Sequence, residues 1–375
     1  MLQTYDAPRR RRWPWILITL VVLIGALWTG GWYYAASKVD ATVAGWKARE
    51  AKAGRHYNCG GLAVSGFPFQ IEVRCTEADA DLRSPSLLIK TKEILVAAAI
   101  WQPTALNGEF TGPMTVREPG ASTSFLVNWE RAQTQMRGLP TAPESAWMGL
   151  DEPTLDRVSA SSREPVFKAR RAELNGRIVS GSPRENPVIE AVLKLVNASA
   201  PSLHPAAARP IDADVTAVMR GLKDFSPKPW PARFREIQAA NGRIEIVKAR
   251  LQQGETIAVA EGTLGLSPRG RLDGQLRLTV ANLEKLLPSL GLDRLVNPQT
   301  ASPQLNSAFN ALDRFAPGLG NVARQNAGPA LAASVNLLGQ PAELEGQRAV
   351  TIPLRFNDGM VMLGPLQLGQ TPPLF

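Results

Sequence analysis

The most constraining feature of this 375-residue sequence is an uncharged stretch near its N-terminus. The 24 residues from Trp13 to Ala36 contain no Asp, Glu, Lys or Arg. As a helix the stretch would be about 36 Å long, enough to cross the roughly 30 Å hydrocarbon core of a bilayer. Aromatic rings favour membrane interfaces, and both ends of the stretch carry them, at Trp13, Trp15, Trp32, Tyr33 and Tyr34. The sequence therefore predicts one membrane-spanning helix.

Charge asymmetry predicts the direction of this helix. Arg9, Arg10, Arg11 and Arg12 immediately precede it, whereas Lys38 is the only basic residue within ten positions after it. By the positive-inside rule residues 1–12 form a cytoplasmic tail, and the rest of the chain lies on the other side. A cleaved signal peptide is the alternative, but its apolar region would be only about 7 to 15 residues long. The sequence favours an uncleaved anchor.

The overall charge gives no sign of a nucleic-acid partner. The net charge of +9 includes the four arginines beside the helix, and the other basic residues are spread along the chain. The sequence has no basic helix and no alternation of basic and aromatic residues of the kind that nucleic-acid binders use. A mildly basic surface suits anionic lipid headgroups, although an ordinary solvated surface has the same composition.

The only two cysteines, Cys59 and Cys75, are predicted to form a disulfide. Two strand-like runs, 62–65 and 69–74, lie between them, and a hairpin centred on Phe67 would bring the thiols together. Closing such a loop is worth about 3 kcal/mol in the chain-entropy model. Two unpaired buried thiols are the alternative. A redox-active or metal site is disfavoured, because neither a CxxC motif nor neighbouring histidines are present.

The remaining pattern predicts a mainly β protein. Residues 37–55 continue the helix as a stalk, with Gly54 at its end, and an elongated antiparallel β-sheet body with a few short covering helices follows. No parallel βαβ rhythm appears. The covering helices are expected after Asn282, up to Leu290, and at 307–315. The strand-like runs are 72–74, 78–82, 87–90, 94–100, 125–129, 131–137, 188–196, 244–251, 256–266, 271–280, 332–338, 349–356 and 360–363. Residues 188–196 also fit a helix, but their alternation favours a strand.

The body divides into two halves at a Pro/Ala-rich stretch, residues 199–210, giving β-rich segments 56–198 and 211–375. In the first half Asn175-Gly176 predicts a hairpin turn. The same Asn-Gly-Arg-Ile sequence recurs 66 residues later, from Asn241 to Ile244. This echo indicates an internal duplication of two similar halves without establishing it.

The predicted strand with the most regular alternation, 271–280, has one apolar face. Leu272, Leu276, Leu278 and Val280 alternate with polar residues, so these four are the candidate residues of an apolar groove. The same alternation fits a closed core beneath the helix expected at 283–290. The pattern leaves both interpretations open.

The sequence contains none of the common catalytic or nucleotide-binding motifs. No G-x-S-x-G elbow, Walker A loop or G-x-G-x-x-G fingerprint occurs. His56 and His204 lack partners at metal-ligand spacing, and Asp212 with Asp214 forms an acidic pair that is common on solvated strands. We expect no catalytic residue, no metal and no cofactor.

Three segments carry a resemblance to a known family. They are residues 60–75, with Gly60-Gly61-Leu62, Ser65-Gly66-Phe67-Pro68-Phe69 and Cys75; residues 264–280, LGLSPRGRLDGQLRLTV; and residues 354–374, LRFNDGMVMLGPLQLGQTPPL. Together they resemble the bacterial family called domain of unknown function 2125. The resemblance implies a single-pass envelope protein of alphaproteobacteria, in the inner membrane with its bulk in the periplasm. More loosely, the rhythm of leucines and glycines is similar to AsmA-like envelope proteins, whose long sheets form grooves associated with phospholipid transport.

The sequence thus favours a non-enzymatic, membrane-anchored protein whose body offers an apolar surface to phospholipid. The alternative is a scaffold or assembly factor that binds another envelope protein through sheet edges or the stalk. An enzyme would need a deep polar pocket that gathers Asp212, Asp214 or His204.

Overall fold

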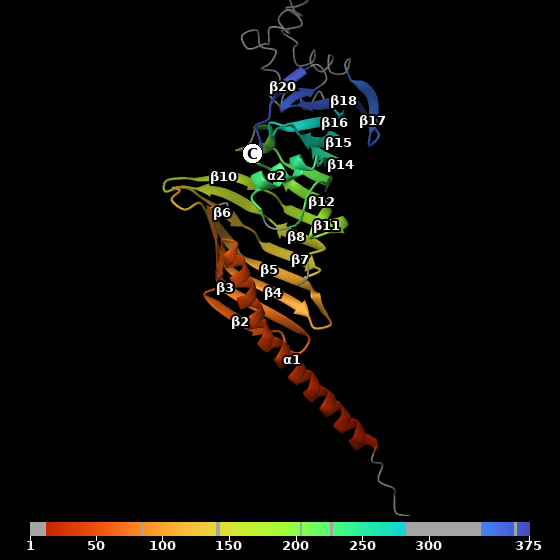
Figure 1. Ribbon diagram of the computed structural model, residues 1–375. Helices are drawn as coiled ribbons and strands as arrows, with labels where there is room; N and C mark the ends of the chain where they lie inside the picture. Colours follow the sequence, from red (N-terminus) through yellow and green to blue (C-terminus); the bar gives the residue numbers. More distant parts are fainter. Residues whose placement is uncertain are drawn as a thin grey trace, which may run out of the picture.

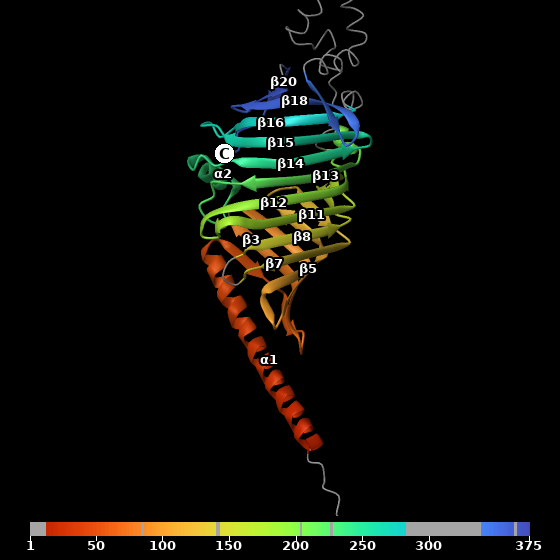
Figure 2. The ribbon, with the colours of Figure 1, turned by 90° about the vertical axis from the view of Figure 1, so that its right-hand side faces the viewer.

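The computed structural model describes residues 13–83, 86–139, 143–202, 205–225, 228–282, 339–363 and 366–375. These residues form one antiparallel sheet with a long helix, α1 (Trp13–Lys52), at its N-terminal end, as Figures 1 and 2 show. The predicted fold class is confirmed: the chain is mainly β, with few helices. The strands are β1 (Arg55–Asn58), β2 (Gly61–Ser65), β3 (Gln70–Arg83), β4 (Ser86–Ala99), β5 (Gln102–Arg117), β6 (Ser124–Asn128), β7 (Arg131–Arg137), β8 (Ser145–Asp151), β9 (Thr154–Val158), β10 (Arg163–Lys168), β11 (Arg171–Ser182), β12 (Glu185–Ala198), β13 (Ile211–Met219), β14 (Ile244–Gln253), β15 (Thr256–Leu266), β16 (Leu272–Ala281), β17 (Gln340–Leu344), β18 (Gln347–Asn357), β19 (Met360–Leu363) and β20 (Leu366–Gln370).

Helix α1 joins the apolar stretch and the stalk in one continuous helix of 40 residues. Its N-terminal half extends beyond the sheet, and its C-terminal half leans on the sheet near β2 and β3 (Figure 1). There the Trp46 ring stacks on Tyr57 of β1, with ring centroids 4.8 Å apart. The chain leaves the helix at Gly54, whose φ of 77° lies in the left-handed region that favours glycine. Gly54 thus ends the helix where the sequence predicts it.

The sheet is a meander in which each long strand pairs with its neighbours in the sequence. From the anchor end it runs β2, β3, β4, β5, β7, β8, β11, β12, β13, β14, β15, β16, β18 and β19, with β20 at the far edge. Figure 2 shows the strands from β5 to β20 stacked one above another along the length of the molecule. The sheet therefore leads from α1 to the opposite end of the protein.

Three of the long strands are interrupted at one line, where the sheet bends. Each consists of two named strands separated by two residues: β6 and β7, β8 and β9, and β10 and β11. The gaps lie side by side, because Glu130 N–H donates to the Asp151 carbonyl and Glu152 N–H to that of Arg170, both at 2.9 Å. Beyond this line β6, β9 and β10 form an arm that diverges from the wall of β7, β8 and β11 (Figure 1).

A short helix, α2 (Trp230–Ala239), packs beside β15, and its Ile237 is 1% exposed. The connection is tight, because a Cβ on Gly221 would overlap the backbone of Gly242. Apart from these two helices, the described chain has one 3-10 turn, η1 (Pro205–Ala208).

One predicted turn is absent from the structure. The Asn175-Gly176 pair is not a hairpin turn: both residues lie inside β11, opposite Val192 and Ala191 of β12. Pairing on both sides of β11 overrides the local turn preference of Asn-Gly. The second Asn-Gly, Asn241-Gly242, does form a turn, with φ of 49° at Asn241, where α2 leads into β14. The echoed sequence therefore has two different structures.

The Pro/Ala-rich stretch 199–210 connects β12 to β13, which pair with each other from Ile189 to Ala198 and from Ile211 to Met219. One sheet thus includes strands from both halves of the chain. The helices expected at 283–290 and 307–315 and the strand at 332–338 lie outside the described residues.

Candidate functional site

One side of the sheet is apolar from the anchor end almost to the far edge, and we call this side the apolar face. Directly paired residues of neighbouring strands share a face, so the register traces rows across the sheet. A central row crosses thirteen strands without one charged residue: Val64, Val73, Val96, Gly108, Thr134, Met148, Leu174, Leu193, Val215, Ala249, Ala260, Leu278 and Ile352. At about 4.8 Å between strands, this row is about 58 Å long.

The rows on either side of the central row have the same character. One runs through Leu106, Met136, Ala146, Gly176, Ala191, Ala217, Ile246, Gly262, Leu276 and Leu354. The other runs through Cys75, Ile94, Phe110, Ala132, Leu150, Ala172, Leu195, Ala213, Leu251, Ala258, Val280 and Val350. The apolar face is therefore at least three residues wide.

Large side chains in the middle of the apolar face are accessible. Met136, Met148, Leu174, Leu193 and Leu251 are each between 37% and 49% exposed. Soluble sheets ordinarily bury such a face against a second layer. A continuous apolar surface that stays accessible over many strands is instead typical of a binding site.

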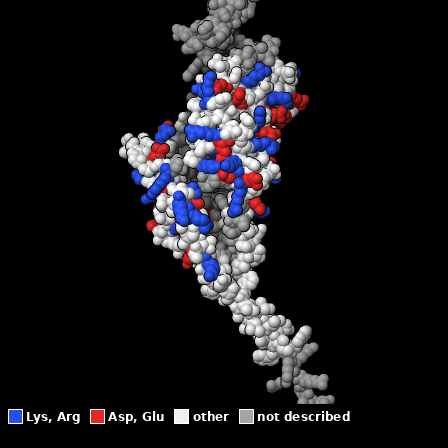
Figure 3. Space-filling view, in the orientation of Figure 1, with Lys and Arg blue, Asp and Glu red and all other residues white. Residues whose placement is uncertain are grey.

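The opposite side, the polar face, is covered by paired charges. Arg74 bonds Glu93 of the neighbouring strand at 2.8 Å, Arg177 bonds Glu190 at 2.7 Å and Arg277 bonds Glu261 at 3.0 Å. Basic and acidic side chains are interspersed over the side of the body that Figure 3 shows, while the protruding part of α1 carries no charge there. Exposed pairs of this kind contribute little stability, so they indicate a solvated face.

The four predicted groove residues all lie in β16 on the apolar face, near its far end. Leu276 and Val280 are only 9% and 2% exposed, whereas Leu272 and Leu278 are half-buried. The accessible part lies further toward the anchor, in β7 to β14. Sequence reasoning missed it there because Thr134 and Gly176 interrupt the apolar alternation of β7 and β11.

The predicted anchor has the length and composition to cross a membrane. Trp13 and Trp15 are exposed at its start, and Tyr33 and Tyr34 are exposed further along. Trp32 is different, because it is the one buried residue of α1 and donates its indole N–H to the Gln70 carbonyl at 2.8 Å. Arg9, Arg10, Arg11 and Arg12 lie outside the described residues.

The predicted disulfide between Cys59 and Cys75 is present, with the two Cα atoms 5.4 Å apart. The hairpin register is not the one expected, since Cys75 pairs with Leu62 rather than with Cys59. Cys59 reaches its partner because the chain is interrupted between β1 and β2, where Gly60 N–H donates to the Thr76 carbonyl at 2.9 Å. The disulfide therefore fastens this interruption to β3.

The sequence profile of one family, described as an uncharacterised protein conserved in bacteria (DUF2125), matches residues 32–372. The chain belongs to this family. The match begins within α1 and continues through β20, so the DUF2125 region includes the whole sheet. No curated protein and no solved structure matches the chain. The looser similarity to AsmA-like proteins is not supported by these comparisons and stays an interpretation.

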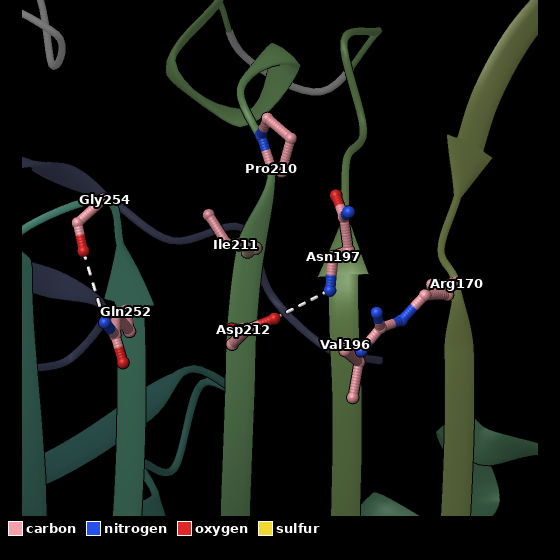
Figure 4. Close-up of a pocket in the computed structure, with 8 residues that line it drawn as sticks. All are labelled: Arg170, Val196, Asn197, Pro210, Ile211, Asp212, Gln252 and Gly254. Carbon is pink, nitrogen blue, oxygen red and sulfur yellow. Dashed lines mark hydrogen bonds between the residues drawn. The ribbon is translucent and has the colours of Figure 1, made fainter.

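A polar cavity of about 420 Å³ lies in the described part of this DUF2125 protein. It opens at the ends of β12, β13 and β14 and is lined by Arg170, Val196, Asn197, Pro210, Ile211, Asp212, Gln252 and Gly254 (Figure 4). The Asp212 carboxylate accepts a hydrogen bond from the Asn197 backbone N–H at 2.7 Å.

The arrangement around the cavity brings few reactive groups together. Asp214 lies on the same face of β13 as Asp212, opposite Arg250 of β14, and does not line the cavity. His204 lies outside the described residues, and His56 lies in β1 opposite Asp81. Within the described ranges no three His, Cys, Asp or Glu side chains are grouped as a metal site would require. The lining of the cavity offers polar contacts to a ligand. The apolar face extends across thirteen strands, so it is the stronger candidate site.

Proposed function

We propose that this DUF2125 protein is a membrane-anchored lipid-binding protein of the cell envelope. Its apolar face binds the acyl chains of phospholipids, and it acts by binding rather than by catalysis. One observation carries the proposal: the central row crosses thirteen strands without a charge, while Leu174 and Leu193 in its middle stay 49% and 37% exposed.

Acyl chains suit this face because of their shape and chemistry. A flexible hydrocarbon chain needs only apolar contact, which is worth about 0.8 kcal/mol for each buried CH₂ group. The headgroup can stay in water beside the sheet. One leaflet of a bilayer is about 15 Å thick in its hydrocarbon part, so a row of about 58 Å has room for several lipids.

The direction of the rows supports handling of lipid away from the membrane. The central row begins at β2 and β3, next to α1, and ends at β18, toward the other end of the molecule (Figure 1). With its N-terminus in the cytoplasm the body lies in the periplasm, in agreement with the Cys59 to Cys75 disulfide, because disulfides persist in oxidising compartments. The proposed task is therefore to shield lipid acyl chains between the inner membrane and a more distant acceptor.

The test is photo-crosslinking at two neighbouring residues on opposite faces. Leu174 and Asn175 are both exposed, but Leu174 belongs to the apolar face and Asn175 to the polar face. A benzophenone amino acid replaces one or the other in the full-length protein, cells are irradiated, and the purified protein is weighed by mass spectrometry. Phospholipid-sized additions are expected with the probe at residue 174 and not at residue 175.

Two outcomes would contradict lipid binding. Equal lipid labelling at both positions would indicate unspecific contact with membrane or detergent. Labelling of a discrete protein at residue 174, with no lipid, would favour the scaffold or assembly factor, because the apolar face would then be a protein interface.

A further inference from the structure

We infer that two turns at the anchor end of the sheet insert their aromatic side chains into the membrane leaflet at the C-terminal end of the apolar stretch of α1. The turns join β2 to β3 and β4 to β5, and we call their rings Phe67, Phe69 and Trp101 the aromatic tip. This inference goes beyond lipid binding by the apolar face, since it concerns different residues and is measured separately.

The aromatic tip is attached to α1 by hydrogen bonds and ring contacts. The Trp28 indole N–H donates to the Pro68 carbonyl and the Trp32 indole N–H to the Gln70 carbonyl, each at 2.8 Å. The Phe67 ring lies edge-on to Trp32, with centroids 5.5 Å apart, and stacks on Tyr33 at 6.3 Å. The β2–β3 turn thus lies at the level of helix residues 28–33.

The level of helix residues 28–33 corresponds to a defined depth in a bilayer. The 20 residues from Trp13 to Trp32 extend about 30 Å as a helix, which equals the thickness of the hydrocarbon core. If Trp13 lies at one interface, Trp32 lies at the other and Trp28 about one turn inside it. A turn bonded to both tryptophans is therefore held at the boundary between acyl chains and headgroups.

The three rings of the aromatic tip are exposed. Phe67, Phe69 and Trp101 are 50%, 60% and 70% exposed. The two turns act together, because Ile100 N–H donates to the Phe69 carbonyl at 3.0 Å and the Phe69 and Trp101 rings are 6.3 Å apart. Fully burying a large apolar side chain is worth about 1.5 to 3 kcal/mol, so three such rings favour a membrane over water.

Polar residues limit the insertion. Glu72 is two positions further along β3 than Gln70 and accepts hydrogen bonds from Gln70 and Ser65. Two strand residues rise about 6.6 Å, so this carboxylate would lie at the headgroups when the tip lies at the acyl boundary. Val64 and Val73, which begin the central row, would then border the membrane directly.

The experiment uses quenching of tryptophan fluorescence by lipids brominated on their acyl chains. The full-length protein is reconstituted in phosphatidylcholine vesicles with and without brominated lipid, and Trp101→Phe is subtracted from wild type to isolate Trp101. The chain provides a matched control in Trp230, which is 66% exposed at the start of α2 and is isolated in the same way with Trp230→Phe. Trp101→Tyr replaces Trp101→Phe if that variant does not fold.

Trp101 emission is expected to be blue-shifted, quenched at least twofold by brominated lipid and protected from aqueous iodide. Trp230 emission is expected to show no blue shift, to be unaffected by brominated lipid and to be quenched by aqueous iodide. Quenching of Trp101 by iodide to the same extent as Trp230 would overturn the inference. Protection from both quenchers would also overturn it, because it would indicate a protein partner on the tip. Lipid crosslinking at residue 174 tests the proposed function separately, so its result does not depend on the quenching of Trp101.

Discussion

Leu174 and Asn175 are adjacent in the chain, yet they define the two environments of this protein. Alternation along a strand sends one side chain to the apolar face and the next to the polar face. This much could be predicted from sequence, and the alternating residues from Leu272 to Val280 lie on the apolar face. The accessibility of Leu174 could not be predicted, because whether an apolar face is covered depends on elements elsewhere in the chain.

At the scale of single residues, Glu236 provides a pH-dependent contribution to stability. Its carboxylate accepts hydrogen bonds from the Lys223 backbone N–H at 2.5 Å and from Lys228 Nζ at 2.6 Å. Burial acts to raise the pKa of Glu236, but these bonds and the Arg233 charge outweigh it and hold the pKa below its usual 4.5. Its stabilising effect is therefore complete above about pH 4.5 and is lost as the pH falls through the lower, folded pKa.

We predict that wild type exceeds Glu236→Gln in thermal stability at pH 6 and that the difference shrinks as the pH falls from 4.5 toward 3. Melting temperatures of the two proteins across this range measure the effect. A difference that stays constant with pH would show that the ionised carboxylate is not responsible.

At the scale of elements, sequence patterns do not fully determine the register in which neighbouring strands pair. The predicted disulfide is correct while the predicted hairpin register is not, because the interruption at Cys59 and Gly60 cannot be recognised from spacing alone. The same holds for the bend, where Glu152 and Asn197 adopt positive φ values of 47° and 53° without a glycine to signal it. Irregular backbone at such points depends on pairing between distant residues.

Two glycines of the apolar face differ in how closely neighbouring atoms approach them. Gly262 in β15 has φ of 143°, and a Cβ there would overlap the Gln275 carbonyl oxygen of β16. Gly176 in β11 has no atom within 4 Å of its would-be Cβ. Gly262→Ala is therefore predicted to lose more than about 1 kcal/mol of unfolding free energy. Gly176→Ala should change it by no more than about 0.5 kcal/mol. Denaturant titration compares the two, and equal losses would contradict the close approach of β15 to β16.

At the scale of the whole molecule, the proposed lipid binding depends on the continuity of the apolar face. A charge in the central row should interrupt the passage of acyl chains, because an unpaired charge in an apolar site costs several kcal/mol. Leu174 is suited to this test, since it is half exposed and its replacement leaves little cavity.

We predict that Leu174→Asp reduces lipid crosslinking at Leu251, beyond the new charge, at least about tenfold, which corresponds to 1.4 kcal/mol. Crosslinking at Met136, on the anchor side, should persist. Both reporter positions are similarly accessible, at 43% and 38% exposure. Asn175→Asp, with the same charge on the polar face, is the matched control. Loss at both reporters, or in the control, would show that lipid does not follow the apolar face.

The meander connectivity also determines the order in which the strands can pair as the chain is synthesised. Because each long strand from β2 to β16 pairs with strands next to it in the sequence, its partner is already present when it is synthesised. Contacts between neighbours in the sequence close short loops and form fast. The sheet can therefore grow strand by strand outward from α1, with each finished strand as the template for the next.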